Sequence, residues 1–122
     1  MSSKALLAAL LAPLAAGALV AQPAAPASGR YEGRLCVATG TASAECGPAA
    51  VTVRSAKDMR VQVADIVYRL ALHSSQLDVV LMHGAMQIDG FTANYDWEGR
   101  ALVFNDPDKP VRYRIEIDPK PR

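Results

Sequence analysis

The sequence predicts an all-β domain, a small antiparallel meander of about seven or eight strands that closes into a barrel or folds into a sandwich. Three observations lead to this fold class. Apolar and polar residues alternate in several short segments, turn residues separate these segments at close spacing, and β-branched and aromatic residues are common within them. A helix over about residues 58–76 is the alternative, and it would make the domain α+β.

The clearest alternation lies near the C-terminus, in residues 111–118. Apolar side chains there alternate with Arg, Glu and Asp, as in a strand with one face in a core. The turn signal around Gly99 and the loop at residues 105–110 separate this strand from those expected at residues 95–97 and 101–105. These segments therefore predict three consecutive antiparallel strands. The same period of two recurs in residues 31–37 and 51–54.

Residues 58–76 fit both a helix and strands. Polar residues recur there every three or four positions, which would place them on one face of a helix. Read in steps of two, residues 66–72 alternate between apolar and polar, with a break in phase at Ala64 that a β-bulge would absorb. We favour strands, because β-branched residues are frequent here and the Ser pair at 74–75 provides a turn. The polar residues are Asp58, Gln62, Asp65, Arg69, His73 and Gln76.

Residues 1–27 predict a signal peptide and a Pro/Ala-rich linker. Lys4 precedes a long apolar run, and small residues follow it, with cleavage sites after Ala21 and after Ala27. Removal of the signal leaves residues 28–122, which we expect to form a single small β domain without a membrane span. We therefore expect the protein to be periplasmic or secreted.

Cys36 and Cys46 are the two cysteines of the chain. In an oxidising compartment, two cysteines that close a short loop containing Gly and Ser favour a disulfide that braces a small core. Their C-x9-C spacing differs from the C-x-x-C of redox motifs. We therefore predict a structural disulfide rather than a redox couple or a metal pair.

Charge and motif content argue against several functional classes. The chain has 13 Lys and Arg against 12 Asp and Glu, with no basic run, so it lacks the clustered positive charge that nucleic-acid binding needs. It also lacks a phosphate-binding Gly-rich loop, a nucleophile elbow and a carboxylate cluster with metal spacing. We therefore expect a protein that is not an enzyme and that uses no cofactor.

An aromatic hairpin is the leading candidate for a binding site. Tyr95 and Trp97 stand two residues apart beside charged residues, and Arg100 follows in the predicted turn. Aromatic and Arg side chains at the rim of a site often anchor a partner. The alternative is that the side chains of Tyr95 and Trp97 face the core. We therefore predict an exported, monomeric, non-catalytic binding module that recognises a protein or a small ligand.

The chain resembles the small barrel proteins of bacterial periplasms, including inhibitors of lysozyme. The resemblance lies in its length, its one expected disulfide and its many short strands. It implies an inhibitor-like role, but no inhibitor motif transfers residue by residue.

Copper binding is an alternative function. Met82, His83 and Met86 cluster in the segment LMHGAMQI, His73 could complete a site, and thioether and imidazole ligands suit copper(I). A two-residue turn at His83 and Gly84 would, however, send the two methionines to opposite faces of a hairpin. A further alternative is an envelope structural protein that binds no ligand.

Overall fold

The computed structural model describes residues 25–122, so most of the predicted signal peptide lies outside the described residues. Eight strands follow one another along this part of the chain. None of it forms a helix with the length and apolarity that a membrane span needs. The strands are β1 (Gly29–Thr39), β2 (Glu45–Ser55), β3 (Asp58–Val63), β4 (Ile66–Leu72), β5 (Gln76–His83), β6 (Met86–Glu98), β7 (Ala101–Asn105) and β8 (Val111–Pro121).

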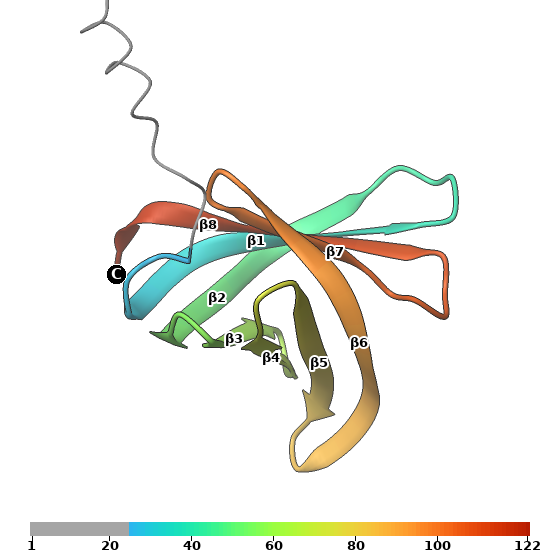
Figure 1. Ribbon diagram of the computed structural model, residues 1–122, viewed down its shortest axis with the longest axis horizontal. Helices are drawn as coiled ribbons and strands as arrows, with labels where there is room; N and C mark the ends of the chain where they lie inside the picture. The colour runs from blue at the N-terminus through green and yellow to red at the C-terminus, as the bar shows by residue number, and fades with distance from the viewer. Residues whose placement is uncertain (1–24) are drawn as a thin grey trace, which may run out of the picture.

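The eight strands form a closed antiparallel barrel. Each strand pairs with the next one in the chain, and β8 closes the barrel by pairing with β1 (Figure 1). This arrangement confirms the predicted all-β meander, in its barrel form. The alternative of a helix over residues 58–76 is wrong, because that segment forms β3, β4 and the start of β5.

The phase break at Ala64 is a turn rather than the expected bulge. Val63 pairs with Ile66, so Ala64 and Asp65 are the two residues that connect β3 to β4. Ala64 has a φ of 56°, the left-handed conformation that tight two-residue turns use. The apolar period therefore resumes at Ile66 because a new strand begins there.

Alternate side chains of the strands point into the barrel and fill it. The interior positions are mostly Val, Leu and Ile, whose branched side chains suit a pleated surface. Their removal from water is the main contribution that stabilises the fold. The largest side chains with almost no exposed surface are Met59, Leu70, Leu77, Leu102 and Ile115.

Four aromatic side chains pack together across the barrel. Tyr113 of β8 stacks on Phe104 with 5.0 Å between ring centroids and on Phe91 with 6.0 Å, and its ring lies edge-on to Tyr68 at 6.1 Å. The cluster joins β4, β6, β7 and β8. Burial raises the pKa of Tyr113 to about 12, because the phenolate would be poorly solvated, and the neighbouring Tyr68 adds to this rise.

When the pH is raised from neutral to alkaline, we expect the free energy of unfolding to fall less in the Tyr113→Phe variant than in the wild type. Unfolded tyrosines ionise near pH 10, whereas Tyr113 stays neutral up to about pH 12 in the barrel. The contribution of the neutral Tyr113 phenol to the free energy of unfolding is therefore fully present below pH 10 and is lost as the pH rises from 10 to 12. Urea unfolding followed by Trp97 fluorescence at about pH 8 and about pH 11.5 should show about 2 kcal/mol more loss in the wild type. Equal losses would contradict the assignment.

The strand β6 changes partner along its length. Residues 86–94 pair with β5, whereas residues 95–98 pair with β7. Figure 1 shows β6 curving away from the β7–β8 hairpin over its first part. Within residues 25–122, no strand pairs with the other side of residues 86–94. We call this unpaired side the β6 edge.

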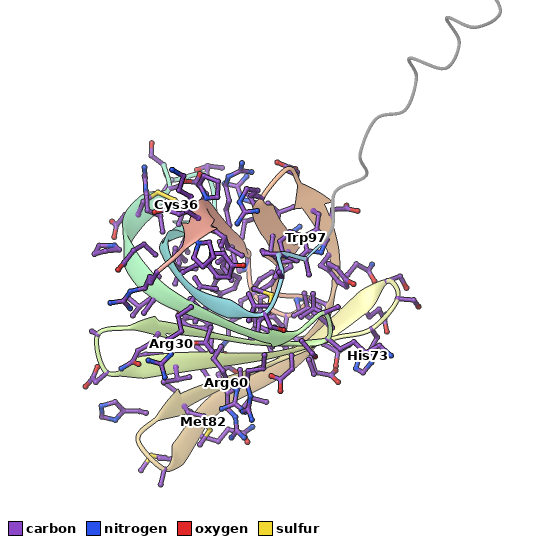
Figure 2. All side chains as sticks on the ribbon, turned by 90° about the vertical axis from the view of Figure 1, so that its left-hand side faces the viewer. Arg30, Cys36, Arg60, His73, Met82 and Trp97 are labelled. Atoms are coloured by element: carbon purple, nitrogen blue, oxygen red, sulfur yellow. A yellow bond between two sulfur atoms is a disulfide. The ribbon has the colours of Figure 1, made fainter. Side chains whose placement is uncertain are left out.

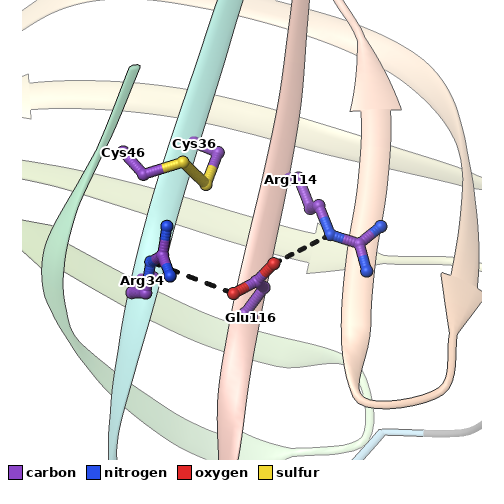
Figure 3. Close-up of a disulfide and its surroundings, with 5 residues drawn as sticks. All are labelled: Arg34, Cys36, Cys46, Arg114 and Glu116. Carbon is purple, nitrogen blue, oxygen red and sulfur yellow. Dashed lines mark hydrogen bonds and ion pairs between the residues drawn. A yellow bond between two sulfur atoms is a disulfide. The ribbon is translucent and has the colours of Figure 1, made fainter. Parts of the chain in front are cut away.

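The predicted disulfide is present. Cys36 and Cys46 lie directly opposite each other on β1 and β2, with 4.0 Å between their Cα atoms (Figure 3). On the same outer face, Glu116 contacts Arg34 at 4.0 Å and Arg114 at 3.1 Å. The bond therefore ties the two strands of the first hairpin together in register, and its presence favours an oxidising compartment.

Candidate functional site

A cleft opens on the barrel surface where β6 leaves β7. It has a volume of about 480 Å³, a size typical of small-ligand sites. We call it the seam cleft. Its polar lining consists of Gln76, Thr92, Asn94, Tyr95, Asp96 and Asn105.

The period of two in β6 brings polar side chains to the cleft. Thr92, Asn94 and Asp96 face outward, while the residues between them face the barrel interior. Gln76 of β5 pairs with Asn94, and its Nε2 donates a hydrogen bond to Asn94 Oδ1 at 3.4 Å. Asn105, the last residue of β7, supplies an amide from the other side. The cleft thus presents side-chain amides from three neighbouring strands.

A carboxylate stands behind the wall of the cleft. The Thr92 hydroxyl donates to Asp78 Oδ1 at 2.6 Å, and His73 Nε2 lies 3.1 Å from Asp78 Oδ2. The hydroxyl first, and then His73, lower the pKa of Asp78, because both stabilise its ionised form. The Tyr95 hydroxyl donates to the His73 carbonyl oxygen at 2.5 Å. These contacts order the wall and leave a negative charge beside the cleft.

An ion pair crosses the far end of the seam. Lys109, in the loop between β7 and β8, lies with its Nζ 2.9 Å from Asp89 Oδ2 on β6. Asp89 Oδ1 also accepts the backbone N–H of Gly90 at 2.8 Å. Lys109, and then the Gly90 N–H, lower the pKa of Asp89. The buried Asp106 shapes the loop, because its Oδ1 accepts the N–H groups of Asp108 and Lys109.

The backbone of the β6 edge is directed into the seam. Glu98 and Ala101 flank the two-residue turn to β7, so these two residues exchange backbone hydrogen bonds. The backbone N–H and C=O groups of every second residue before Glu98 point to the same side of β6 as those of Glu98. Asn94 and Thr92 therefore direct their N–H and C=O groups away from β5. The Gly90 N–H agrees with this assignment, because it bonds to a side chain rather than to β5.

A second depression, of about 620 Å³, lies over the outer faces of β1, β7 and β8 near the disulfide. Two of its three charged side chains, Glu98 and Arg114, contact each other. Arg114 donates to Glu98 at 2.6 Å and to Glu116 at 3.1 Å. The seam cleft, whose amides keep unused donors and acceptors, is therefore the stronger candidate site.

Of the three predicted binding residues, Tyr95 lines the seam cleft and the other two do not. Trp97 packs against the buried core (Figure 2), and so does Tyr95, which borders the cleft as well, so both side chains lie as the alternative interpretation expected. Arg100 donates from Nε to the Ile117 carbonyl oxygen at 3.1 Å and from Nη2 to that of Asp118 at 2.5 Å. The structure therefore ties Trp97 and Arg100 into the barrel rather than into one site with Tyr95.

The turn between β5 and β6 lies one residue later than expected. His83 pairs with Met86, so Gly84 and Ala85 form the turn, and Gly84 has a φ of 62°. Met82, one residue earlier on β5, faces the opposite side from His83, because neighbours on a strand alternate. The two methionines therefore still lie on opposite faces of the hairpin.

The four predicted copper ligands do not share one site in the structure. His83 Nε2 lies 2.7 Å from Asp65 Oδ2, and Met82 faces the other side of the sheet. His73 precedes β5, so the length of that strand separates it from His83. Figure 2 shows His73 and Met82 well apart on the barrel. Within residues 25–122, no group of three or more His, Cys, Asp and Glu side chains is placed to hold a metal ion.

Two large apolar side chains are exposed at the start of β6. Met86 has 65% and Ile88 49% of its surface exposed. Exposed apolar groups that adjoin one another are typical of contact surfaces, whereas single ones are common on any protein. These two residues lie on the same strand as the seam cleft and beside the same unpaired edge.

Sequence reasoning missed Thr92, Asn94 and Asn105 as candidate binding residues. A signal was present in residues 91–97, where Thr, Asn and Asp alternate with Phe, Ala, Tyr and Trp. The alternation assigns the polar set to an outer face. Nothing local indicated that Asn105 and Gln76 would lie beside that face, because this depends on pairing between strands.

Comparison of the chain with protein-family models, with curated proteins and with solved structures found no match.

Proposed function

We propose that the protein is an exported, non-catalytic binding module whose ligand occupies the seam cleft. One observation carries this proposal: the cleft gathers three side-chain amides, a hydroxyl and a carboxylate beside an unpaired strand edge. Each amide offers both donors and an acceptor, and so does unpaired backbone. A ligand held there makes several hydrogen bonds at once, as specific sites usually require.

The polar groups of the cleft favour binding over catalysis. Amides neither titrate nor act as nucleophiles near neutral pH. Thr92 donates to Asp78, but a lowered pKa makes that carboxylate a weak base for the hydroxyl proton. His73 contacts Asp78 rather than Thr92, so the imidazole is not placed to activate the hydroxyl.

Export fits a binding role. The N-terminal residues predict a signal peptide. The Cys36–Cys46 disulfide is favoured by an oxidising compartment. We therefore propose a periplasmic or secreted location, in which the ligand is a molecule outside the cytoplasm.

Two-dimensional NMR of the isotope-labelled protein tests the proposal. Pools of oligopeptides and oligosaccharides are titrated into the protein, and a ligand of the seam cleft should shift the backbone signals of Thr92, Asn94 and Asn105. We expect Asn105→Ala to weaken such a ligand about fivefold, because one neutral hydrogen bond contributes roughly 1 kcal/mol.

The matched control for this experiment is Gln62→Ala. It removes an exposed amide from β3, where the side chain donates to the Ala64 carbonyl oxygen and does not line the cleft. The affinity of a seam-cleft ligand should be unchanged in this variant. Ligand shifts that always cluster elsewhere on the barrel, or an equal effect of both variants, would contradict the proposal.

A further inference from the structure

We propose that the seam cleft takes an extended polypeptide segment with basic side chains, added as a strand to the β6 edge. This inference rests on the proposed function and names its ligand class. Addition of a strand to an exposed sheet edge is a recurring mode of peptide recognition. Main-chain hydrogen bonds supply the affinity, and alternate side chains supply the specificity.

Unpaired backbone is the first argument. Thr92 directs its N–H and C=O groups into the seam, and Asn94 directs its N–H group there, with no described strand paired with either residue on this side. These groups repeat every second residue, or about 7 Å along the strand. An extended peptide repeats its own groups at the same spacing, whereas a sugar does not. The edge is therefore a template for a strand.

The space beside this edge suits a single strand. On its far side the cleft is bounded by Asn105 and Pro107, where β7 ends and the loop to β8 begins. Pairing with β7 closes one end of the seam at Tyr95, and the ion pair between Lys109 and Asp89 crosses the other. An extended segment of about five residues, roughly 17 Å long, spans this distance.

Acidic side chains outnumber basic ones around the seam, where the nearby basic residues are Lys109 and Arg112, which lies on β8 and pairs with Asn105. Asp96 lines the cleft, Asp78 stands behind its wall, and Asp89 and Asp108 lie toward the far end. Lys109 is the one basic residue in the loop between β7 and β8, and it is paired with Asp89. Opposite charge steers association and selects partners more than it adds affinity. Lys or Arg side chains on the incoming segment therefore complement this surface.

Met86 and Ile88 extend the same surface toward the β5–β6 turn. Both lie at the start of the β6 edge with much of their side chains exposed. A segment that continues beyond the seam cleft would cover them and remove apolar surface from water. We therefore expect the partner segment to combine basic and apolar residues.

Two synthetic peptides with blocked termini serve as probes. One alternates Lys and Val, and the other alternates Glu and Val at the same length. We expect the Lys peptide to shift the backbone signals of Thr92 and Asn94 and to bind about tenfold more tightly than the Glu peptide at low salt. Its binding should also slow hydrogen exchange at the Asn94 N–H, because that group enters a new ladder.

Asn94 offers a matched pair of variants. Asn94→Pro removes the N–H that faces the seam and spares the ladder to β5, and edge positions tolerate Pro. Asn94→Ala removes the side chain and keeps the N–H. We expect Asn94→Pro to bind the Lys peptide about fivefold more weakly than Asn94→Ala, the effect of one lost hydrogen bond.

Asp96→Asn provides a second test that leaves the backbone intact. It removes a carboxylate that lines the cleft and keeps the shape of the side chain. We expect the preference for the Lys peptide over the Glu peptide to fall about threefold. This readout keeps the inference testable even where Asn94→Pro does not fold.

The outcomes separate this inference from the proposed function. Equal affinity for the two peptides, or equal losses in Asn94→Pro and Asn94→Ala, would overturn the added strand. Seam-cleft shifts with maltotriose, and none with either peptide, would also overturn it but would leave the cleft as a binding site. The absence of seam-cleft shifts with every probe would count against both.

Discussion

Gly33→Ala is expected to destabilise the barrel by about 3 kcal/mol or more. A Cβ at Gly33 would collide with the carbonyl oxygen of Glu116 on β8 and would lie 3.0 Å from Cγ2 of Val51. The first obstacle is strand backbone and the second is core, so neither can move without loss of packing. Gly33 also stands where the register between β1 and β8 shifts. Urea denaturation should show a lower midpoint with an unchanged slope.

Gly47→Ala is the matched control for this substitution. Gly47 lies on β2 in the same hairpin, and a Cβ there would meet no atom within 4 Å. The free energy of unfolding should change by less than about 0.5 kcal/mol or rise slightly, because Ala restricts the unfolded chain. Equal changes in the free energy of unfolding for Gly33→Ala and Gly47→Ala would contradict the prediction, because the close approach of β8 would then not explain the glycine at position 33.

Most of the fold could be predicted from local patterns. The alternation in residues 111–118 corresponds to β8, and the turn signals at Gly99 and at residues 74–75 mark real ends of strands. Such patterns are informative because each strand of a filled barrel buries one face. In residues 58–76 the β-branched side chains indicated strands correctly, although the helical spacing of the polar residues was equally regular.

The change of partner along β6 could not be predicted from the sequence. Residues 86–98 form one continuous strand of 13 residues, whereas β7 has 5 residues. A strand as short as β7 cannot cover the whole of β6, so the first part of β6 keeps an unpaired side. The seam cleft results from this mismatch in length. The sequence of one strand does not indicate how long its neighbour in the sheet will be, so the mismatch cannot be predicted from either segment alone.

The structure places the predicted site residues apart from one another for related reasons. Local alternation places Trp97 inside the barrel, and Arg100 finds its acceptors on β8, far away in sequence. Tyr95 reaches the cleft because pairing with β7 begins there. In the β5–β6 turn, a shift of one residue changes which side chains lie opposite each other, so His83 pairs with Met86 instead of forming part of the turn.

Removal of the disulfide is expected to destabilise the domain by about 3 kcal/mol. The Cys36→Ser and Cys46→Ser double variant opens a loop that the bond closes over a sequence separation of 10. The closed loop restricts the conformational freedom of the unfolded chain. A domain of this size has only a modest core, which cannot compensate for loss of the disulfide. Urea denaturation of the double variant and of the wild type reduced with dithiothreitol should give the same decrease in the free energy of unfolding.

Arg34→Ala serves as a control in the same hairpin. Its guanidinium contacts Glu116 at 4.0 Å with both side chains largely exposed, so its removal should change stability far less than loss of the disulfide. A decrease below about 1 kcal/mol in the double variant would mean that strand pairing alone holds the hairpin. None of the residues that line the seam cleft belongs to β1 or β2. Reduced protein that remains folded should therefore bind the Lys peptide as tightly as the oxidised protein. This result would show that the disulfide contributes to stability and not to binding.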